Sequence, residues 1–233
     1  MLIQQPANPL DRTETDRTCA RYQRLAPFYD LMEIRAERRF RPWRERLWRQ
    51  LRGPRVIEVG VGTGKNMPYY PNGLDITAID LAPGMLERAR KRAKALNLSV
   101  DLRLGDVQAL EFPDASFDAA VATFVFCSVP DPVLGLSELK RVVKPGGQVY
   151  LLEHVRSPHR LLGALMDILN PMMVRMMGAN INRQTVSNVQ IAGLELVDVE
   201  NLRLGGIFQL ILARVYDHSL QTGNQKPSFD GIP

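Results

Sequence analysis

The sequence predicts an α/β fold with a doubly wound, seven-stranded sheet that is mostly parallel and ends in an antiparallel hairpin. Two observations predict it. From residue 55 onward, apolar strand-like runs alternate with helical patterns, which is typical of a parallel sheet covered on both faces. The last two runs have no long crossover helix between them, so they predict an antiparallel pair.

Each predicted element has its own local signal. Strands are expected at 55–59, 75–79, 99–104, 117–122, 148–153, 194–202 and 208–215. The helix 83–96 opens with a proline, and the helix 131–143 repeats its leucines at helical spacing. The Lys-Pro-Gly-Gly turn at 144–147 ends that helix and begins a strand. Two more helices are expected within 18–51 and two within 161–192.

A chain of 233 residues is long enough for one domain with an appended cap. We expect residues 1–53 to form an N-terminal helical cap or lid that contains a basic amphipathic helix. The main domain is expected to span 54–217, with a helical insertion at about 159–192 after the fifth strand. Residues 218–233 are polar, contain glycine and proline, and predict a flexible tail.

The amino-acid composition indicates in which cellular compartment the protein is located. Hydrophobic residues make up 45% and charged residues 24% of the chain, as in ordinary globular proteins. Two cysteines, Cys19 and Cys127, offer neither a disulfide framework nor a metal cluster. The sequence shows no secretory signal and no apolar run of about eighteen residues that could span a membrane. A cytoplasmic location is therefore expected.

A glycine-rich turn follows the first strand. The segment reads Val56-Ile-Glu-Val-Gly60-Val-Gly62-Thr-Gly64-Lys-Asn66, with Glu58 just before the glycines. Glycines let the backbone approach a ligand closely, and an acid at the end of the next strand, here Asp80, can bind a ribose. The turn therefore predicts a site for a nucleotide-like cofactor.

The spacing of the turn excludes two phosphate-binding motifs. After Gly60 and Gly62, a dinucleotide fingerprint requires a glycine where Lys65 stands. A P-loop requires a glycine and a hydroxyl where this chain has Val59 and Asn66. An acid beside the turn suits a cationic ligand better than it suits a pyrophosphate.

The pattern Glu-x-Gly-x-Gly-x-Gly at 58–64 resembles the class I S-adenosylmethionine-dependent methyltransferases, which have a Rossmann-like sheet. The segments 117–122 and 143–147 are similar to that family's fourth strand and to the turn before its fifth, so the resemblance covers roughly 55–214. It implies S-adenosyl-L-methionine as the cofactor, S-adenosyl-L-homocysteine as the product and no metal.

The resemblance also implies roles for single residues. Asp80 would bond the ribose hydroxyls, Leu81 and Met85 would pack on the adenine, and Asp106 would meet the adenine amino group. Residues 123–126 would lie at the amino-acid tail of the cofactor. The implied cofactor-binding set is Glu58, Gly60, Gly62, Thr63, Gly64, Asn66, Asp80, Leu81, Met85, Asp106, Val107, Thr123 and Phe124.

A narrower resemblance concerns the methyl acceptor. Ala26-Pro-Phe-Tyr-Asp30, followed by Trp43-Arg44, is similar to the quinone C-methyltransferases and their relatives, a group that includes the bacterial phosphatidylethanolamine N-methyltransferases. Leu152-Glu153-His154 and the segment 178–185 resemble those lipid enzymes and the membrane-associated thiol S-methyltransferases. Quinone enzymes usually lack that histidine. A quinone is therefore the third candidate acceptor, after phosphatidylethanolamine and a thiol.

A basic helix is expected within 35–55. This stretch holds nine arginines against two glutamates, a local charge of +7 in a chain of +5, so the remainder is mildly acidic. Trp43 and Trp48 share one helical face, and arginines such as Arg39 lie on the other. Such a helix can lie on an anionic membrane surface. Packing of the same face on the domain is the alternative.

The segment 161–177 is apolar at helical spacing and holds five of the nine methionines. Methionine side chains adapt to irregular apolar ligands, which favours a lipid-like acceptor, although a core helix explains the same periodicity. Asp167, Asn170 and Arg175 exclude a membrane span.

The candidate catalytic residues are His154, as general base or polar orienter, and Tyr29. The candidate residues for substrate or membrane contact are Tyr22, Arg39, Trp43, Trp48, Glu153, Asn180 and Arg183. Cys127 has no activating partner at an interpretable spacing and is expected to be a buried apolar residue.

The sequence thus favours methylation of an amphiphilic acceptor, the amine of phosphatidylethanolamine, by a monomer or weak oligomer on the inner face of the membrane. A small-thiol S-methyltransferase and a quinone-ring C-methyltransferase are the enzymatic alternatives. The non-enzymatic alternatives are a nucleic-acid-binding protein that uses the arginines and a membrane-surface scaffold that binds the cofactor without turnover. The shared face of Trp and Leu argues against nucleic acid.

Overall fold

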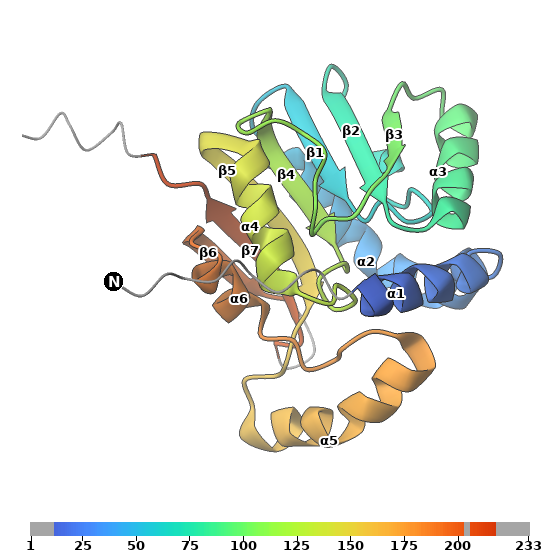
Figure 1. Ribbon diagram of the computed structural model, residues 1–233, viewed down its shortest axis with the longest axis vertical. Helices are drawn as coiled ribbons and strands as arrows, with labels where there is room; N and C mark the ends of the chain where they lie inside the picture. The colour runs from blue at the N-terminus through green and yellow to red at the C-terminus, as the bar shows by residue number, and fades with distance from the viewer. Residues whose placement is uncertain (1–11, 203–205, 218–233) are drawn as a thin grey trace, which may run out of the picture.

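The computed structural model describes residues 12–202 and 206–217, which form an α/β fold around one seven-stranded sheet (Figure 1). The strands are β1 Arg55–Val59, β2 Asp75–Asp80, β3 Asp101–Leu104, β4 Phe117–Thr123, β5 Val143–His154, β6 Glu195–Asn201 and β7 Phe208–Arg214. The helices are α1 Arg12–Leu25, α2 Tyr29–Arg49, α3 Pro83–Ala95, α4 Pro132–Val142, α5 Arg160–Met177 and α6 Thr185–Ile191, with a short 3-10 helix η1 at Met67–Tyr69.

The strand order is β3-β2-β1-β4-β5-β7-β6. The first five strands in this order pair in parallel, whereas β7 pairs antiparallel with both β5 and β6, which confirms the predicted final hairpin. From β1 the chain first runs toward one edge of the sheet through β2 and β3. It then continues on the other side of β1 with β4, so β2 and β4 are the two neighbours of β1. Ligands of open α/β sheets bind at the carboxyl ends of strands at such a reversal point.

Helices cover both faces of the sheet. On one face, α4 and α6 pack Leu136, Leu139 and Val189 against the sheet. On the other face, α2 and α3 bury Leu47 and Leu86. Figure 1 shows α4 in front of the sheet and α2 behind it. The second half of α2 is therefore part of the main domain. The sequence analysis instead expected residues 1–53 to form an appended cap.

Two predicted boundaries differ from the structure. The first N-terminal helix begins at Arg12, six residues before the expected start. The expected turn at 144–147 falls inside β5, because Val143 already pairs with Phe117 before a register shift. Gly147 permits this close pairing, since a Cβ there would lie 2.7 Å from the Asp118 carbonyl oxygen. The predicted tail at 218–233 lies outside the described residues.

The insertion after β5 stands apart from the sheet. Figure 1 shows α5 at the end of the molecule where α1 and α2 lie. Hydrogen bonds attach it to the main domain: Asn170 bonds to Asn180, and the Asn180 amide donates to the Cys127 carbonyl at 2.8 Å. In the described part of the chain, none of the helices has the length and apolar character needed to cross a membrane.

Candidate active site

A cavity lies at the carboxyl ends of β1, β2 and β4, beneath the two N-terminal helices. Its floor is the glycine turn after β1, and its sides are the segments that follow β2, β3 and β4. Thr18 and Tyr22 of α1 and Tyr29, Glu33 and Arg44 of α2 form the roof. The structure thus brings the predicted glycine turn, the acids after two strands and the N-terminal helices to one place.

The glycine turn has the geometry of a ligand cradle. Gly60 has φ +65°, and a Cβ there would lie 2.5 Å from a methyl carbon of Val125. Gly62 has φ +56°, yet a Cβ there would meet no atom within 4 Å, although the residue lines the cavity. The space above Gly62 is therefore open to a closely approaching ligand, which fits the cofactor implied by the resemblance.

Asp80 joins the end of β2 to this turn. Its carboxylate accepts hydrogen bonds from the Gly62 amide at 2.8 Å and from the Ala82 amide at 2.9 Å. Burial raises the pKa of Asp80, and the backbone hydrogen bonds act in the opposite direction. Leu81 and Met85 line the cavity beside it.

Asp106 lies after β3 on the same side of the cavity. Its carboxylate accepts from the Gln108 amide at 2.9 Å, and Val107 lines the wall next to it. Both cavity acids therefore stand over β2 and β3, where the resemblance expects the nucleoside half of the cofactor.

Glu58 does not line the cavity, contrary to the expected direct contact with a cationic ligand. It is 1% exposed, and its carboxylate accepts from Asn66 Nδ2 at 2.6 Å and from the Tyr70 hydroxyl. Burial raises the pKa of Glu58 to about 7, while the bonds from Tyr70 and Asn66 and the nearby Arg44 lower it. Glu58 therefore orients Asn66 behind the turn. Thr123 lines the cavity and accepts from Asn66 at 2.9 Å.

An ion-pair cluster joins α2 to the glycine turn. Asp30 accepts from the Thr63 hydroxyl at 2.6 Å and from Arg92 of α3 at 2.9 Å. Lys65 donates to Glu33, and its ammonium lies 5.0 Å from the centroid of the Tyr29 ring. The N-terminal lid is thereby held directly on the cofactor turn. The sequence predicts Thr63 and Tyr29 of this cluster as site residues. It does not predict a site role for Asp30, Glu33, Lys65 and Arg92.

Tyr22 and Tyr29 line the cavity with their rings 6.4 Å apart between centroids. The Tyr22 hydroxyl bonds to Ser128 at 2.5 Å. Burial raises the pKa of Tyr22 and of Tyr29 well above the usual tyrosine range, so both phenols are neutral near pH 7. They can act as hydrogen-bond donors and as aromatic surface for a cationic group.

His154 is not among the residues that line the cavity. Its ring packs edge-on against Phe208 at 5.2 Å, and burial lowers its pKa. Phe208 belongs to an aromatic cluster with Phe40, Trp43 and Phe124, of which Phe124 reaches the cavity. The proposed general base, His154, thus lies behind the cavity wall, and the Phe208 ring separates it from Phe124.

Glu153, Asn180 and Arg183 support the segment after β4. Glu153 is fully buried and accepts from the Val125 and Phe126 amides at 3.0 and 3.2 Å, and burial raises its pKa to about 7. Asn180 bonds to the Cys127 carbonyl, and Arg183 donates to the Val129 carbonyl at 2.6 Å. These three residues therefore hold the cavity wall from behind.

The three residues expected on the basic helix have different environments. Arg39 is exposed, Trp43 is half-buried in the aromatic cluster, and Trp48 is 1% exposed and packs on Tyr70 with 4.4 Å between ring centroids. Trp48 cannot contact a substrate or a membrane, because it lies in the core. Arg44 of the same helix lines the cavity, and sequence reasoning missed it apart from its place in the Trp-Arg dipeptide.

Comparison with known sequences gives a family and three relatives. A methyltransferase domain family model matches residues 57–151. Demethylmenaquinone methyltransferase of Renibacterium salmoninarum is 32% identical over 175 residues, 73% of this chain and 71% of that protein. Phosphatidylethanolamine N-methyltransferase of Cereibacter sphaeroides is 43% identical over 105 residues, 44% and 52% of the two chains, so this chain spans about half of that relative. Thiol S-methyltransferase TMT1B of Rattus norvegicus is 31% identical over 151 residues, 62% of each.

Comparison with solved structures agrees on the fold. A methyltransferase from Thermotoga maritima matches 84% of this chain and 98% of its own length with a TM-score of 0.62, at 24% identity. A geranyl diphosphate methyltransferase in complex with GPP and sinefungin matches 75% of this chain and 78% of its own length, with a TM-score of 0.63 at 18% identity.

Proposed function

This chain belongs to the class I S-adenosylmethionine-dependent methyltransferases, and on that premise we propose that it methylates an amphiphilic acceptor at a membrane surface, the amine of phosphatidylethanolamine. When bound, S-adenosylmethionine supplies an electrophilic methyl group. The chain itself has to hold the acceptor amine beside that group and exclude water, since an in-line displacement gains most from positioning. The lid of α1 and α2 and the neutral rings of Tyr22 and Tyr29 suit this task.

One observation above all supports the membrane part of the proposal: the apolar stripe of α5 faces away from the protein. The stripe consists of Leu161, Leu165, Ile168, Met172 and Met176, whose exposed fractions are 89%, 50%, 75%, 52% and 69%. The opposite side of α5, with Gly163 and Met166, faces the domain and is buried. Monomeric soluble proteins rarely expose so continuous an apolar stripe, which is typical of a surface that binds a lipid layer or another protein.

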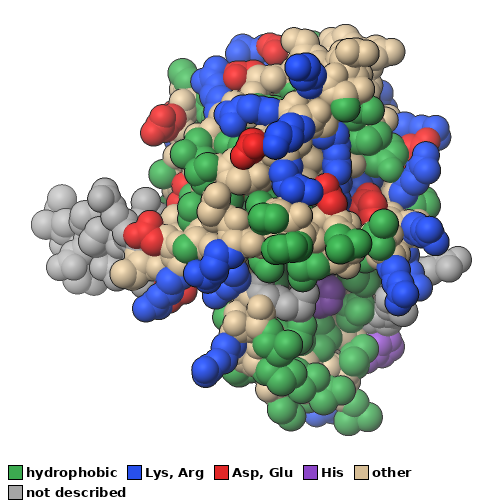
Figure 2. Space-filling view, turned by 90° about the vertical axis from the view of Figure 1, so that its right-hand side faces the viewer, with side chains coloured by type: hydrophobic (Ala, Val, Ile, Leu, Met, Phe, Trp, Pro, Cys, Tyr) green, Lys and Arg blue, Asp and Glu red, His purple; other side chains and the backbone are tan. Residues whose placement is uncertain are grey.

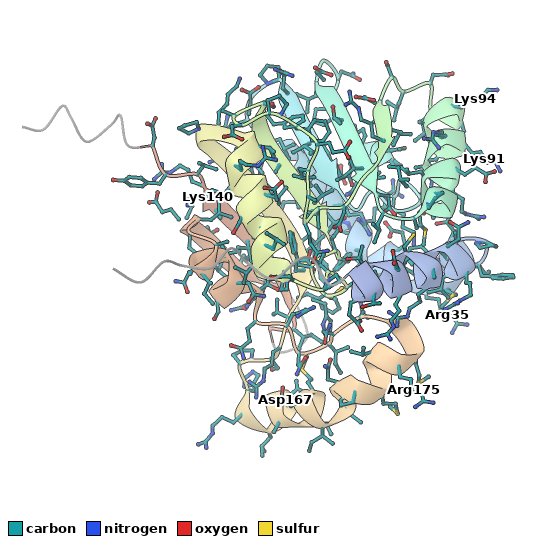
Figure 3. All side chains as sticks on the ribbon, in the orientation of Figure 1. Arg35, Lys91, Lys94, Lys140, Asp167 and Arg175 are labelled. Carbon is teal, nitrogen blue, oxygen red and sulfur yellow. The ribbon has the colours of Figure 1, made fainter. Side chains whose placement is uncertain are left out.

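A second group of exposed apolar side chains lies at and just before the start of α2. Phe28, Leu31, Met32 and Ile34 are between 57% and 71% exposed. Figure 2 shows hydrophobic side chains gathered over the lower lobe, and Figure 3 places Arg35 of α2 and Arg175 of α5 at the same end of the molecule. Apolar side chains bordered by arginines suit a bilayer with anionic headgroups. Because α2 also roofs the cavity, a lipid amine held at this surface would lie near the cofactor.

Fewer arginines of the segment 35–55 are available to bind nucleic-acid phosphates than their number suggests. Arg44 is buried beside Glu37, and three others are ion-paired: Arg46 with Glu200, Arg49 with Glu45 and Arg55 with Asp75. Phosphate binding depends on cations that are free to replace counterions, so these four contribute little.

The acceptor is tested by mixing the purified protein with labelled S-adenosylmethionine and vesicles of phosphatidylethanolamine and phosphatidylglycerol. We expect label in mono-, di- or trimethylated lipid, and none in vesicles of phosphatidylcholine, which has no free amine. A hydrophobic thiol and demethylmenaquinone in the same vesicles are the parallel acceptors. Label in either of these, with none in the lipid, would show that the acceptor has been assigned wrongly.

The docking surface is tested by replacing Ile168 with serine. Loss of one apolar side chain from a membrane contact costs about 1.5 kcal/mol, so binding to anionic vesicles is expected to weaken roughly tenfold in a sedimentation assay. Ile191→Ser is the matched control, because Ile191 is 70% exposed on α6 against 75% for Ile168 on α5. Equal losses for the two variants would mean that α5 has no special part in docking.

A further inference from the structure

Arg44 is a buried cation whose charge the protein compensates only in part. The side chain is 4% exposed, yet it lines the cofactor cavity. Nη1 donates to Asn66 Oδ1 and to Thr123 Oγ1, both at 2.8 Å, and both acceptors are neutral. Nε lies 3.1 Å from a Glu37 carboxylate oxygen without making a hydrogen bond. A buried charge is costly unless it is paired and bonded, so a partner for the remaining donors is expected.

We infer that Arg44 binds the carboxylate of the amino-acid tail of S-adenosylmethionine. None of the hydrogen bonds among the described residues involves Nη2 of Arg44, so this nitrogen is free to donate to a ligand. A guanidinium presents a planar fork that matches a carboxylate. This role of Arg44 depends on the proposed cofactor and not on the proposed acceptor. A negative result in the lipid assay would therefore leave it unaffected.

The order of the strands places Arg44 at the correct end of the cavity. Of the two cavity acids, Asp80 ends β2 and Asp106 follows β3, whereas Thr123, which bonds Arg44, ends β4. In the sheet, β1 and its glycine turn lie between these two sides. A ligand whose nucleoside lies over the acids therefore reaches past Gly62 toward Arg44 with its other end, which is the zwitterionic tail.

The second cation in the cavity is already occupied. Lys65 is 10% exposed, donates to Glu33 and has Asp30 at 4.0 Å. Its ammonium also lies over the Tyr29 ring. The charge of Lys65 is thus compensated by two carboxylates, whereas Nη2 of Arg44 has no protein partner among the described residues.

The buried acid of the glycine motif, Glu58, supports Arg44 indirectly. Glu58 and Thr123 hold the Asn66 amide, and Asn66 in turn accepts from Arg44. Glu58 is therefore a positioning residue, which orients Arg44 through Asn66.

Calorimetric titration with S-adenosylhomocysteine and with its decarboxylated analogue tests the assignment. The analogue keeps the adenosine, the thioether and the amine. We expect the unmodified protein to bind it about 10- to 100-fold more weakly, since a hydrogen-bonded charge pair is being removed. Arg44→Met should bind S-adenosylhomocysteine more weakly by the same factor and should no longer distinguish the two ligands.

The matched control is Arg41→Met, because Arg41 is exposed on the same helix and has no part in the cavity. It should leave both affinities unchanged. Equal affinity of the unmodified protein for the two ligands would overturn the assignment, and this measurement does not depend on any variant folding. Equal weakening of both ligands by Arg44→Met would also overturn it, since that is the signature of a purely structural role. Arg44→Lys keeps the charge without the fork and should retain part of the discrimination.

Discussion

Replacing Gly62 by alanine is expected to weaken cofactor binding about 100-fold while the protein remains folded. The added methyl group would clash with no protein atom, because a Cβ at Gly62 meets nothing within 4 Å. It would instead occupy the part of the cavity directly above the turn, where forcing a ligand past an extra methyl costs about 1 to 3 kcal/mol. Titration calorimetry with S-adenosylhomocysteine measures the loss.

Gly73 provides the control for backbone strain. Like Gly62, it has a positive φ, +83° against +56°, and a Cβ there would also meet no atom within 4 Å. Gly73 does not line the cavity. Both alanine variants should lose about 1 to 2 kcal/mol of unfolding free energy, the cost of a left-handed non-glycine residue. Gly73→Ala should bind the cofactor normally. Normal binding by Gly62→Ala would show that the cofactor does not approach this turn.

Replacing Trp48 by alanine is expected to reduce the free energy of unfolding by about 3 to 5 kcal/mol, as for other buried large aromatic residues. Trp48 packs on Tyr70 and shares a core cluster with Val56, Ala78 and Val121 of the sheet. Domains of ordinary stability have about 5 to 15 kcal/mol in total, so the loss is a large share. Urea unfolding followed by circular dichroism measures it.

Trp48→Phe separates packing from hydrogen bonding. The buried Nε1 of Trp48 has no hydrogen-bond partner, so its removal leaves no acceptor unpaired. The phenylalanine variant is expected to lose less than about 1.5 kcal/mol. If Trp48→Ala kept full stability and lost binding to vesicles instead, the helix would lie on a membrane rather than on the sheet.

The sequence contained enough information for the sheet and for the cofactor turn. Strands buried on both faces are nearly continuous apolar runs, so 55–59 and 117–122 could be placed directly. The glycine turn depends on a spacing within seven residues, and such local patterns do not require knowledge of the tertiary structure. The acids Asp80 and Asp106 could be found because they follow predicted strands, whose carboxyl ends meet at one edge.

The environments of the α2 side chains could not be predicted from the sequence in the same way. An apolar stripe shows that something covers a helix, but it does not show whether that cover is a sheet or a lipid layer. The sequence therefore left open whether Trp48 would pack on the domain or on a membrane, and it gave no sign that Arg44 would be buried. Glu58 was misplaced for a related reason: side chains alternate along β1, so Glu58 lies on the face of Val56, which α2 covers, and its carboxylate is bonded by Asn66 and Tyr70.

The position of β7 has a consequence for how the chain assembles. β6 is synthesised before β7, yet β6 pairs in the sheet with β7, and β7 also covers the open edge of β5. While the ribosome has not yet released residues 208–214, the nascent sheet exposes the edge of β5, and β6 has no place to add. Exposed strand edges are sites of aggregation. β6 can therefore join the sheet only together with β7 or after it, although it is made first.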